Sequence, residues 1–327
     1  MRAVVATRAG GPEVLQVTDV PDPEPRPDEV VVRVAAAGVN FIDTYRRSGV
    51  YRMPFPHVVG SEGAGEVVAV GADVTTLAPG DRVAWSSAAG SYAELVAVRE
   101  ADAVVVPPGV DDATAGALPL QGLTAHYLVS STFPVAAGHD VLLHAGAGGV
   151  GLLVTQLAAA RGARVVSTVG SPEKEHLARA AGAADVIRYR ELSDLTTELP
   201  ALVRELTGGR GVHVVYDGVG RDTFDASLAS LARRGTLVLF GGASGQVPPL
   251  DLQRLNAAGS LYVTRPTLGD HVATREELEW RATELFDAVR AGALDVRIGA
   301  TFPLADAADA HRALEGRATT GKVLLLP

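Results

Sequence analysis

Four glycines stand between an apolar run and a helix-like segment, in the stretch HAGAGGVG from His144 to Gly151. Glycine costs roughly 0.5–1 kcal/mol relative to alanine inside regular structure, so the cluster indicates a tight turn or a group held against the backbone. Gly146, Gly148 and Gly151 fit G-x-G-x-x-G, whose glycines allow a tight turn, backbone contact with a pyrophosphate and close helix packing. A helix starting near Gly149 would direct free N–H groups at that pyrophosphate. The stretch predicts a dinucleotide site.

The end of the next strand-like run separates NAD from NADP. An NAD-binding chain normally offers Asp or Glu to the ribose hydroxyls about 20 residues after the glycines. Residues 168–171 read Thr-Val-Gly-Ser and hold no carboxylate. Ser171 can donate a hydrogen bond and Lys174 follows just inside a helix, which favours a phosphate. Glu173 and Glu175 count against this, and a solvated lysine is the alternative for Lys174. The sequence favours NADPH.

The elements around this stretch alternate between strand and helix from about residue 122. Helices are expected near 149–161, from the N-cap Ser171, and near 222–233. The six apolar runs between them are DVLLHAG, ARVVSTVG, ADVIRYR, VHVVYDGVG, TLVLFGG and SLYVTRP. Short apolar strands separated by helices predict a doubly wound parallel sheet with right-handed crossovers.

The rest of the chain has a different pattern. The first third is rich in short strands and turns, which predicts a small, mostly β domain. Near the end, Thr274 and Glu277 form a capping-box pattern that opens a long helix to Arg290. The closing run KVLLLP reads as a strand. No repeat or low-complexity tract interrupts these segments.

Composition narrows the function classes. The 327 residues are 47% hydrophobic and 20% charged, with a net charge of -9 and no cysteine. Disulfides, thiolate catalysis and cysteine-ligated zinc are therefore excluded. The acidic balance and the absence of long basic runs argue against nucleic acid. No window reaches the ~18 apolar residues of a membrane span, and the first residues lack a signal-peptide core, so no membrane association and a cytoplasmic location are expected.

Seven motifs together carry a family resemblance that runs nearly end to end. They are GGPEVLQV, AAGVNFIDTYRRSGVY, GSEGAGEVVAVG, GDRVAW, QGLTAHYL, YDGVGRDTF and SLYVTRPTL. The chain resembles the zinc-independent NADPH:quinone oxidoreductases, the zeta-crystallin-like branch of the medium-chain dehydrogenase/reductase superfamily. The resemblance implies an α/β protein with a GroES-like, mostly β catalytic domain (1–123 and 266–327) around a Rossmann domain (124–265). It also implies a homodimer joined largely through the Rossmann sheets.

Two positions bear on zinc. The zinc-dependent alcohol dehydrogenases of this architecture carry a cysteine ligand where this chain has Asn40 and a histidine where it has Ser61. Amide and hydroxyl groups are not usual zinc ligands, and the cysteine-rich lobe that holds structural zinc is absent. No metal is expected. Without a Lewis acid to stabilise an alkoxide, hydride delivery to an electron-poor quinone or enone is favoured over alcohol oxidation.

The candidate catalytic residues are Asn40, Asp43, Tyr45 and Tyr51, in and beside FIDTYRRSGVY. The resemblance implies that this segment lines the nicotinamide and substrate side, with Tyr45 and Tyr51 the main substrate contacts. The alternative for each tyrosine is a half-buried packing residue. No general acid is assigned.

The resemblance also implies the cofactor contacts. Thr124 and the glycine loop would hold the ribose, nicotinamide and pyrophosphate. The adenosine phosphate would be surrounded by Ser171, Lys174 and Tyr189, and the nicotinamide end would be flanked by Phe240, Val263, Thr264 and Arg265. Arg317 would reach back to the cofactor. The full set is Asn40, Thr124, Gly146, Gly148, Gly149, Val150, Gly151, Gly170, Ser171, Lys174, Tyr189, Phe240, Val263, Thr264, Arg265 and Arg317. A surface turn is the alternative for Arg317. His144 is expected to be a buried, hydrogen-bonded imidazole.

Three functions stay open at this point. The leading one is NADPH-dependent quinone reduction, and the second is reduction of α,β-unsaturated carbonyls. The third is an NADPH-binding structural or RNA-associated protein, which the acidic charge disfavours.

Overall fold

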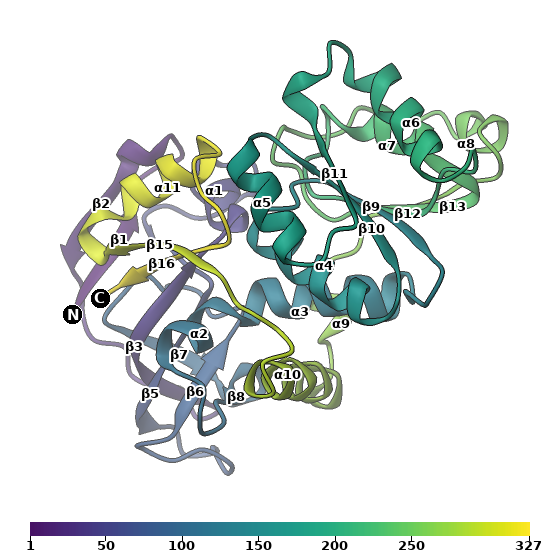
Figure 1. Cartoon of the computed structure of the whole chain (residues 1–327). Helices are drawn as coiled ribbons and strands as arrows, with labels where there is room; N and C mark the ends of the chain where they lie inside the picture. Colours follow the sequence, from purple (N-terminus) through teal and green to yellow (C-terminus); the bar gives the residue numbers. More distant parts are fainter. The chain divides into compact units, whose positions relative to one another are not determined.

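The computed structural model describes the chain from Met1 to Pro327 and divides it into two units (Figure 1). The first unit comprises Met1–Leu123 and Val272–Pro327, and the second comprises Thr124–His271. The predicted Rossmann segment ends at 265, whereas the contacts of the second unit continue to His271, whose ring stacks on Tyr127 with 4.2 Å between centroids. No helix is both long and apolar enough to cross a bilayer.

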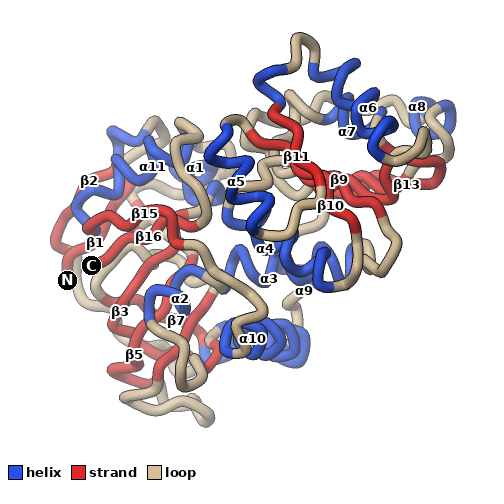
Figure 2. The backbone as a smooth tube through the Cα atoms, in the orientation of Figure 1, coloured by secondary structure: helices blue, strands red, loops and turns tan.

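The first unit is built on β-sheets, drawn as red strands in Figure 2. Its large sheet has the order β15-β16-β3-β5-β6-β8, and β7 also pairs with β3. A three-stranded sheet has the order β2-β1-β4. The strands are β1 (Arg2–Ala6), β2 (Leu15–Asp19), β3 (Glu29–Val39), β4 (His57–Val58), β5 (Glu62–Val70), β6 (Arg82–Trp85), β7 (Leu95–Arg99), β8 (Val104–Val105), β15 (Ile298–Pro303) and β16 (Lys322–Leu326). Valines of β3 and the Trp85 and Tyr92 rings fill the core between them.

Helices complete the first unit. They are α1 (Phe41–Ser48), α2 (Asp112–Ala117), α10 (Arg275–Arg290) and α11 (Ala307–Glu315), and α3 (Pro119–Tyr127) runs across the boundary between the units. The capping box of α10 is confirmed, because Glu277 N–H donates to Thr274 Oγ1 and Thr274 N–H donates to the Glu277 carboxylate. The helix ends at Arg290 as predicted.

The second unit is a six-stranded sheet of order β11-β10-β9-β12-β13-β14, with every pair parallel. The doubly wound parallel sheet is therefore confirmed. The strands are β9 (Asp140–Leu143), β10 (Arg164–Val169), β11 (Asp185–Arg188), β12 (Val212–Asp217), β13 (Leu231–Leu239) and β14 (Tyr262–Thr264). The helices are α4 (Gly149–Ala160), α5 (Pro172–Ala180), α6 (Leu195–Leu206), α7 (Phe224–Ala229), α8 (Gln253–Ala257) and α9 (Leu268–His271). Figure 1 shows α4 and α5 together on one side of the strands and α6 and α7 on the other.

One predicted element is wrong in extent. The helix expected near 222–233 ends at Ala229, and Leu231 already pairs with Val212 as the start of β13. Leu231 is buried, while Arg233 and Arg234 face solvent and Arg234 has a left-handed φ of 59°. Pairing of Leu231 with the neighbouring strand therefore overrides the local helical pattern.

Candidate active site and cofactor site

The glycine loop lies between β9 and α4, and two of its glycines have no room for a side chain. Ala145 has a left-handed φ of 55°, and its carbonyl accepts a hydrogen bond from Gly148 N–H at 2.9 Å. A Cβ on Gly146 would lie 1.6 Å from Ser167 Oγ, and one on Gly151 would lie 2.4 Å from Ala145 O. Neither position can hold any residue larger than glycine without moving its neighbours.

The amino end of α4 supplies the polar groups for an anion. Gly149, Val150 and Gly151 form its first turn, so their N–H groups have no acceptor within the helix. That first turn carries no acidic residue. Backbone donors and a positive helix end, next to a glycine-rich loop, fit the pyrophosphate of a dinucleotide.

A buried polar network begins at His144, directly before this loop. His144 bonds Thr168 Oγ1 through Nδ1 and Ser227 Oγ through Nε2, each at 2.9 Å. Ser227 in turn donates to Asp217 at 2.8 Å. Burial lowers the pKa of His144 and keeps the imidazole neutral. The network ties β9, β10, β12 and α7 together, and His144 is a structural residue of the kind predicted.

The carboxyl ends of β10 and β11 bring together the residues predicted around the adenosine phosphate. A Cβ on Gly170 would lie 2.8 Å from the Tyr189 hydroxyl oxygen. Ser171 caps α5, because its Oγ accepts a hydrogen bond from Lys174 N–H at 3.3 Å. This corner of the sheet carries a serine, a lysine and a tyrosine where a carboxylate would mark NAD.

The residues predicted near the nicotinamide gather at the ends of β13 and β14. Phe240 follows β13, and its ring atom Cζ lies 2.8 Å from the position of a Cβ on Gly218. Val263 and Thr264 belong to β14, which pairs with β13. Arg265 donates to the carbonyl of Leu239 at 3.1 Å. Thr124, on α3, is 8% exposed.

The residues predicted on the substrate side lie on and around α1 in the first unit. Asn40 precedes the helix, and its N–H donates to the Asp43 carboxylate at 3.0 Å. Tyr45 and Tyr51 pack edge to face with 5.8 Å between centroids, and Tyr51 is 40% exposed. Asn40 and Asp43 are buried. The segment therefore has an aromatic outer part and a polar inner part.

The Asn40 side chain is hydrogen-bonded to two buried charged residues, Lys322 and Glu62. Nothing in the sequence pattern links these residues. Lys322 Nζ donates to Asn40 Oδ1 at 2.8 Å and also pairs with Glu62, while Asn40 Nδ2 donates to Glu62 at 2.7 Å. The second oxygen of Glu62 accepts from Leu120 N–H at 2.7 Å. Burial lowers the pKa of Lys322, and the Glu62 carboxylate opposes that shift.

This donor set does not fit zinc. The two positions that carry ligands in zinc-dependent alcohol dehydrogenases hold the Asn40 amide and the Ser61 hydroxyl. A cationic ammonium, Lys322, is hydrogen-bonded to that amide. Zinc prefers thiolate, imidazole or carboxylate ligands and would be repelled by the ammonium.

Asp43 is fully buried and accepts three hydrogen bonds from side chains and backbone. Ser61 Oγ donates to it at 2.6 Å and Tyr92 Oη at 3.1 Å, in addition to Asn40 N–H. Burial raises the pKa of Asp43 from 3.8 to about 6, against the lowering effect of these bonds and of the Arg46 guanidinium. Arg46 also donates to Ser61 Oγ at 2.7 Å.

A second chain of bonds links Asp43 to α11. Arg47 donates to His311 Nδ1 at 3.0 Å and pairs with Glu315 at 2.7 Å. Arginine has no acceptor atom, so His311 carries its hydrogen on Nε2 and directs it at Tyr92 Oη, 3.3 Å away. Burial and Arg47 lower the pKa of His311 to about 3. The helix α1 is thereby fixed to α11.

The structure brings the predicted residues into two groups, one in each unit. Arg317 belongs to the first unit, in the turn after α11, where its φ of 57° is left-handed. The roles assigned to individual residues stay predictions.

Sequence reasoning missed the inner polar residues Glu62, Tyr92, His311 and Lys322. Glu62 directly follows Ser61 and could have been considered from that proximity. Lys322 and His311 offered no signal, because 282 positions separate Lys322 from Asn40 and 264 separate His311 from Arg47. Only the fold brings these residues together.

Comparisons with known proteins agree with this architecture. Residues 26–108 match the model described as the alcohol dehydrogenase GroES-like domain, and residues 149–287 match that of the zinc-binding dehydrogenases. A quinone oxidoreductase of Pseudomonas aeruginosa is 48% identical over 97% of both chains. The chain belongs to the quinone oxidoreductase family. Within the medium-chain dehydrogenase/reductase superfamily, the expected pairing of a GroES-like domain with a Rossmann domain is confirmed.

Two further relatives describe the range of this family. The crystal structure of Escherichia coli quinone oxidoreductase complexed with NADPH is 42% identical, has a TM-score of 0.97, and each chain is fully covered by the other. A 2-haloacrylate reductase of a Burkholderia species is 39% identical over 99% of this chain and 98% of its own. The matching model is named after zinc-binding dehydrogenases. This quinone oxidoreductase differs from the zinc-dependent members of the superfamily at Asn40, Ser61 and Lys322.

Proposed function

We propose that the protein is an NADPH-dependent quinone reductase. The observation that carries this proposal is the glycine loop between β9 and α4, where a Cβ on Gly146 or Gly151 would collide with its neighbours, followed by a β10 end without a carboxylate. A dinucleotide with a phosphate on its ribose fits this arrangement. The family relationship to quinone oxidoreductases supplies the acceptor class.

Residues of the second unit bind the cofactor, and residues of the first unit bind the acceptor. Gly149, Val150 and Gly151 offer N–H groups to the pyrophosphate, while Ser171 and Lys174 bind the ribose phosphate. NADPH, when bound, supplies the hydride. Tyr45 and Tyr51 orient the flat acceptor and offer hydroxyl donors to the oxygen on which negative charge develops. Asn40 and Asp43 hold the segment that carries the two tyrosines.

The experiment is steady-state oxidation of NADPH with a panel of quinones and a panel of enones. We expect turnover with quinones and a preference for NADPH over NADH of about tenfold or more, because charge-assisted phosphate bonds contribute about 1.5–3 kcal/mol each. Equal dissociation constants for the two cofactors would contradict the cofactor choice. Absence of turnover with every quinone, with NADPH still bound, would contradict the acceptor class.

A second candidate is reduction of an activated carbon–carbon double bond. The similarity to a 2-haloacrylate reductase favours it, because an acrylate is an α,β-unsaturated acid. Such a substrate needs a proton on carbon, whereas a quinone needs protons only on oxygen. Turnover with enones that exceeds turnover with quinones would make this the main activity.

A homodimer through the β14 edge and a cytoplasmic location complete the proposal. β14 is an edge strand of the six-stranded sheet, and its Tyr262 is 61% exposed. An exposed strand edge with apolar side chains suits pairing with a second copy. Light scattering of the purified protein tests the dimer, and a Tyr262→Lys variant should weaken it.

Cell fractionation tests the location, which the need for NADPH supports.

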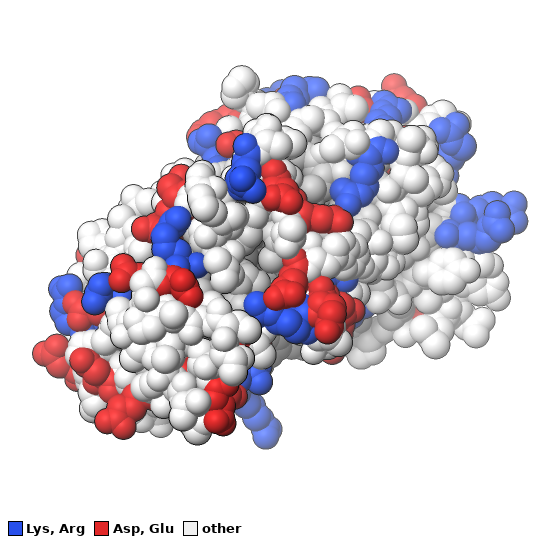
Figure 3. Space-filling model, turned by 90° about the horizontal axis from the view of Figure 1, so that it is seen from below, with Lys and Arg blue, Asp and Glu red and all other residues white.

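A small-molecule partner suits the surface better than a nucleic acid does. In the view of Figure 3, acidic and basic side chains are interspersed across the middle of the face. The chain has 38 acidic and 29 basic residues in total. An extended positive stripe, which tracks a phosphate backbone, needs the opposite balance. A filter-binding assay with RNA would detect the alternative.

A further inference from the structure

Two residues beyond β11 lie next to the corner predicted for the ribose phosphate. β10 and β11 are parallel, with Val169 opposite Arg188, so the chain after β11 passes beside Gly170. A Cβ on Gly170 would lie 2.8 Å from the Tyr189 hydroxyl oxygen and 3.4 Å from Arg190 Nε. Tyr189 is among the predicted contacts of the phosphate, but Arg190 is not. The guanidinium nevertheless lies at the same strand end.

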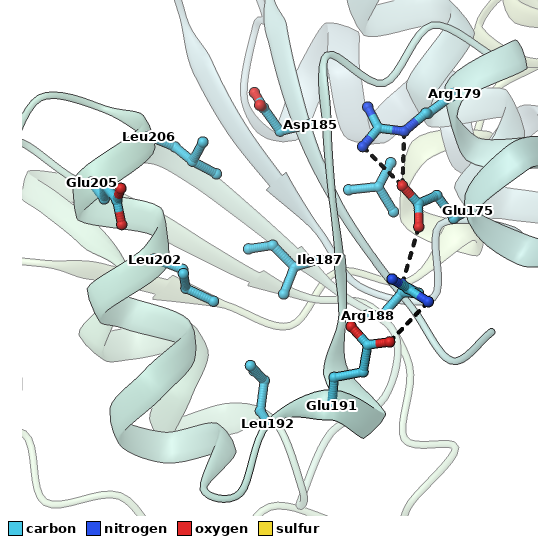
Figure 4. Close-up of a pocket in the computed structure, with 11 residues that line it drawn as sticks. Glu175, Arg179, Asp185, Ile187, Arg188, Glu191, Leu192, Leu202, Glu205 and Leu206 are labelled. Carbon is cyan, nitrogen blue, oxygen red and sulfur yellow. Dashed lines mark hydrogen bonds and ion pairs between the residues drawn. The ribbon is translucent and has the colours of Figure 1, made fainter. Parts of the chain in front are cut away.

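Arg190 differs from the other arginine of this segment in what it binds. Arg188 pairs with Glu175 at 3.2 Å and with Glu191 at 2.8 Å. Figure 4 shows these two ion pairs, together with the pair between Glu175 and Arg179, along the wall of a cavity of about 370 Å³. Arg190 is exposed and forms no ion pair or side-chain hydrogen bond. Its five N–H donors are available to a ligand.

The neighbouring carboxylates strengthen this contrast. Glu175 pairs with Arg179 and Arg188, and Glu191 pairs with Arg188, so both carboxylates have cationic partners other than Arg190. Glu173, exposed in the first turn of α5, is the remaining acid near the corner and forms no ion pair. A built ion-pair network beside an unpaired arginine leaves a local excess of positive charge at the end of β10.

We propose that Arg190 binds the 2′-phosphate of NADPH together with Lys174 and is a determinant of the preference for NADPH over NADH. The inference rests on the NADPH dependence proposed above and adds a residue to it. A guanidinium presents a planar pair of donors that matches two phosphate oxygens, which a single ammonium cannot do. Gly170 leaves room for this contact, because any side chain there would meet Tyr189 and Arg190.

Arg190→Gln tests the proposal, with Arg233→Gln as a matched control. Arg233 is an exposed arginine of the same unit without an ion pair, and it lies near the start of β13, at the amino-terminal edge of the sheet away from the strand ends. Calorimetric titrations would use NADPH, NADH, 2′,5′-ADP and 5′-AMP as ligands. Arg190→Gln should weaken NADPH and 2′,5′-ADP about tenfold and change NADH and 5′-AMP less than about twofold. Arg190→Lys should lose part of this affinity, and Arg233→Gln none.

Two results would overturn the proposal. Unchanged affinity for 2′,5′-ADP in Arg190→Gln would show that the guanidinium does not reach the phosphate. Equal weakening of NADPH and NADH would place it on the adenine or ribose instead. Thermal unfolding of each variant shows that the fold is retained, which is expected because Arg190 is exposed.

The titrations need no electron acceptor, so they are independent of quinone turnover. A wild-type protein that binds 2′,5′-ADP and reduces no quinone would contradict the proposed acceptor. The titrations would still test the role of Arg190 in phosphate binding. A wild-type protein that binds 2′,5′-ADP and 5′-AMP equally would overturn the NADPH proposal itself. Lys174→Ala, measured in the same titrations, should also reduce the preference for NADPH over NADH.

Discussion

Lys322 donates a hydrogen bond to the side-chain oxygen of Asn40 over 2.8 Å, although 282 positions separate the two residues. The ammonium is 1% exposed and also pairs with Glu62, which is fully buried. The amide of Asn40 donates to the same carboxylate. Asn40, which stands in place of a zinc ligand, is thus fixed by a buried ion pair. The N-terminus of α1 is therefore positioned by hydrogen bonds to Lys322 and Glu62.

Lys322→Met should be strongly destabilising. Removal of one partner from a buried ion pair leaves an uncompensated charge, which costs about 3–5 kcal/mol. Chemical denaturation of wild type, Lys322→Met, Glu62→Gln and the double variant measures the effect. The double variant should lose less stability than the sum of the two single losses, because each change removes the same interaction. Simple additivity would show that the two charges are not coupled.

Metal removal should leave the enzyme unaffected. Asn40 and Ser61 are poor zinc ligands, and the nearby ammonium of Lys322 repels a cation. Elemental analysis of protein purified without added metal should find no stoichiometric zinc, and exhaustive chelation should not change turnover. Loss of activity on chelation, followed by its return when zinc is added, would contradict this prediction. Zinc would then have to be bound by residues other than Asn40 and Ser61.

Much of the fold could be predicted from the sequence, because it is specified locally. The glycine loop, the N-cap Ser171 and the capping box at Thr274 each lie within a few residues, and the alternation of apolar runs with helices specifies the parallel sheet. The helix predicted to 233 failed at Leu231, since burial against β12 outweighs local pattern. The inner polar network could not be predicted, because it joins residues from opposite ends of the chain.

The stability of the protein should carry a pH-dependent contribution from Asp43. Burial raises its pKa from 3.8 to about 6, so the folded state binds the proton more tightly than the unfolded state does. The contribution is therefore fully present below about pH 3.8 and is lost as the pH rises through about 6. Two pKa units correspond to about 3 kcal/mol. Denaturation at several pH values, with Asp43→Asn as reference, should show wild type losing stability relative to the variant over this window. A constant difference would contradict the shift.

Gly146→Ala should disrupt the cofactor loop. The new methyl group would lie 1.6 Å from Ser167 Oγ, so the loop or β10 must move. We expect NADPH affinity to fall at least tenfold, and we expect a loss of stability of about 1–3 kcal/mol from overpacking. Ser167→Ala in the same protein should restore part of both, because the nearest remaining atom, Ser167 Cβ, lies 3.0 Å away. Gly148→Ala is the milder control for stability, because its closest contact within the protein is 3.2 Å. Normal NADPH binding by Gly146→Ala would mean that the loop is looser than the structure shows.

Tyr45 and Tyr51 should affect turnover with quinone more than they affect NADPH binding. Their rings pack edge to face, and the exposed ring of Tyr51 can present its hydroxyl to an acceptor. A quinone is already electrophilic, so Tyr51→Phe should lower kcat/KM only about tenfold, near 1.4 kcal/mol. A defect above about a thousandfold, with folding intact, would make this hydroxyl the proton donor. An unchanged Tyr45→Phe/Tyr51→Phe double variant would assign both rings to packing alone. Measuring quinone and enone in the same variants separates orientation from proton supply, because only the enone requires protonation on carbon and should suffer more if either hydroxyl delivers that proton.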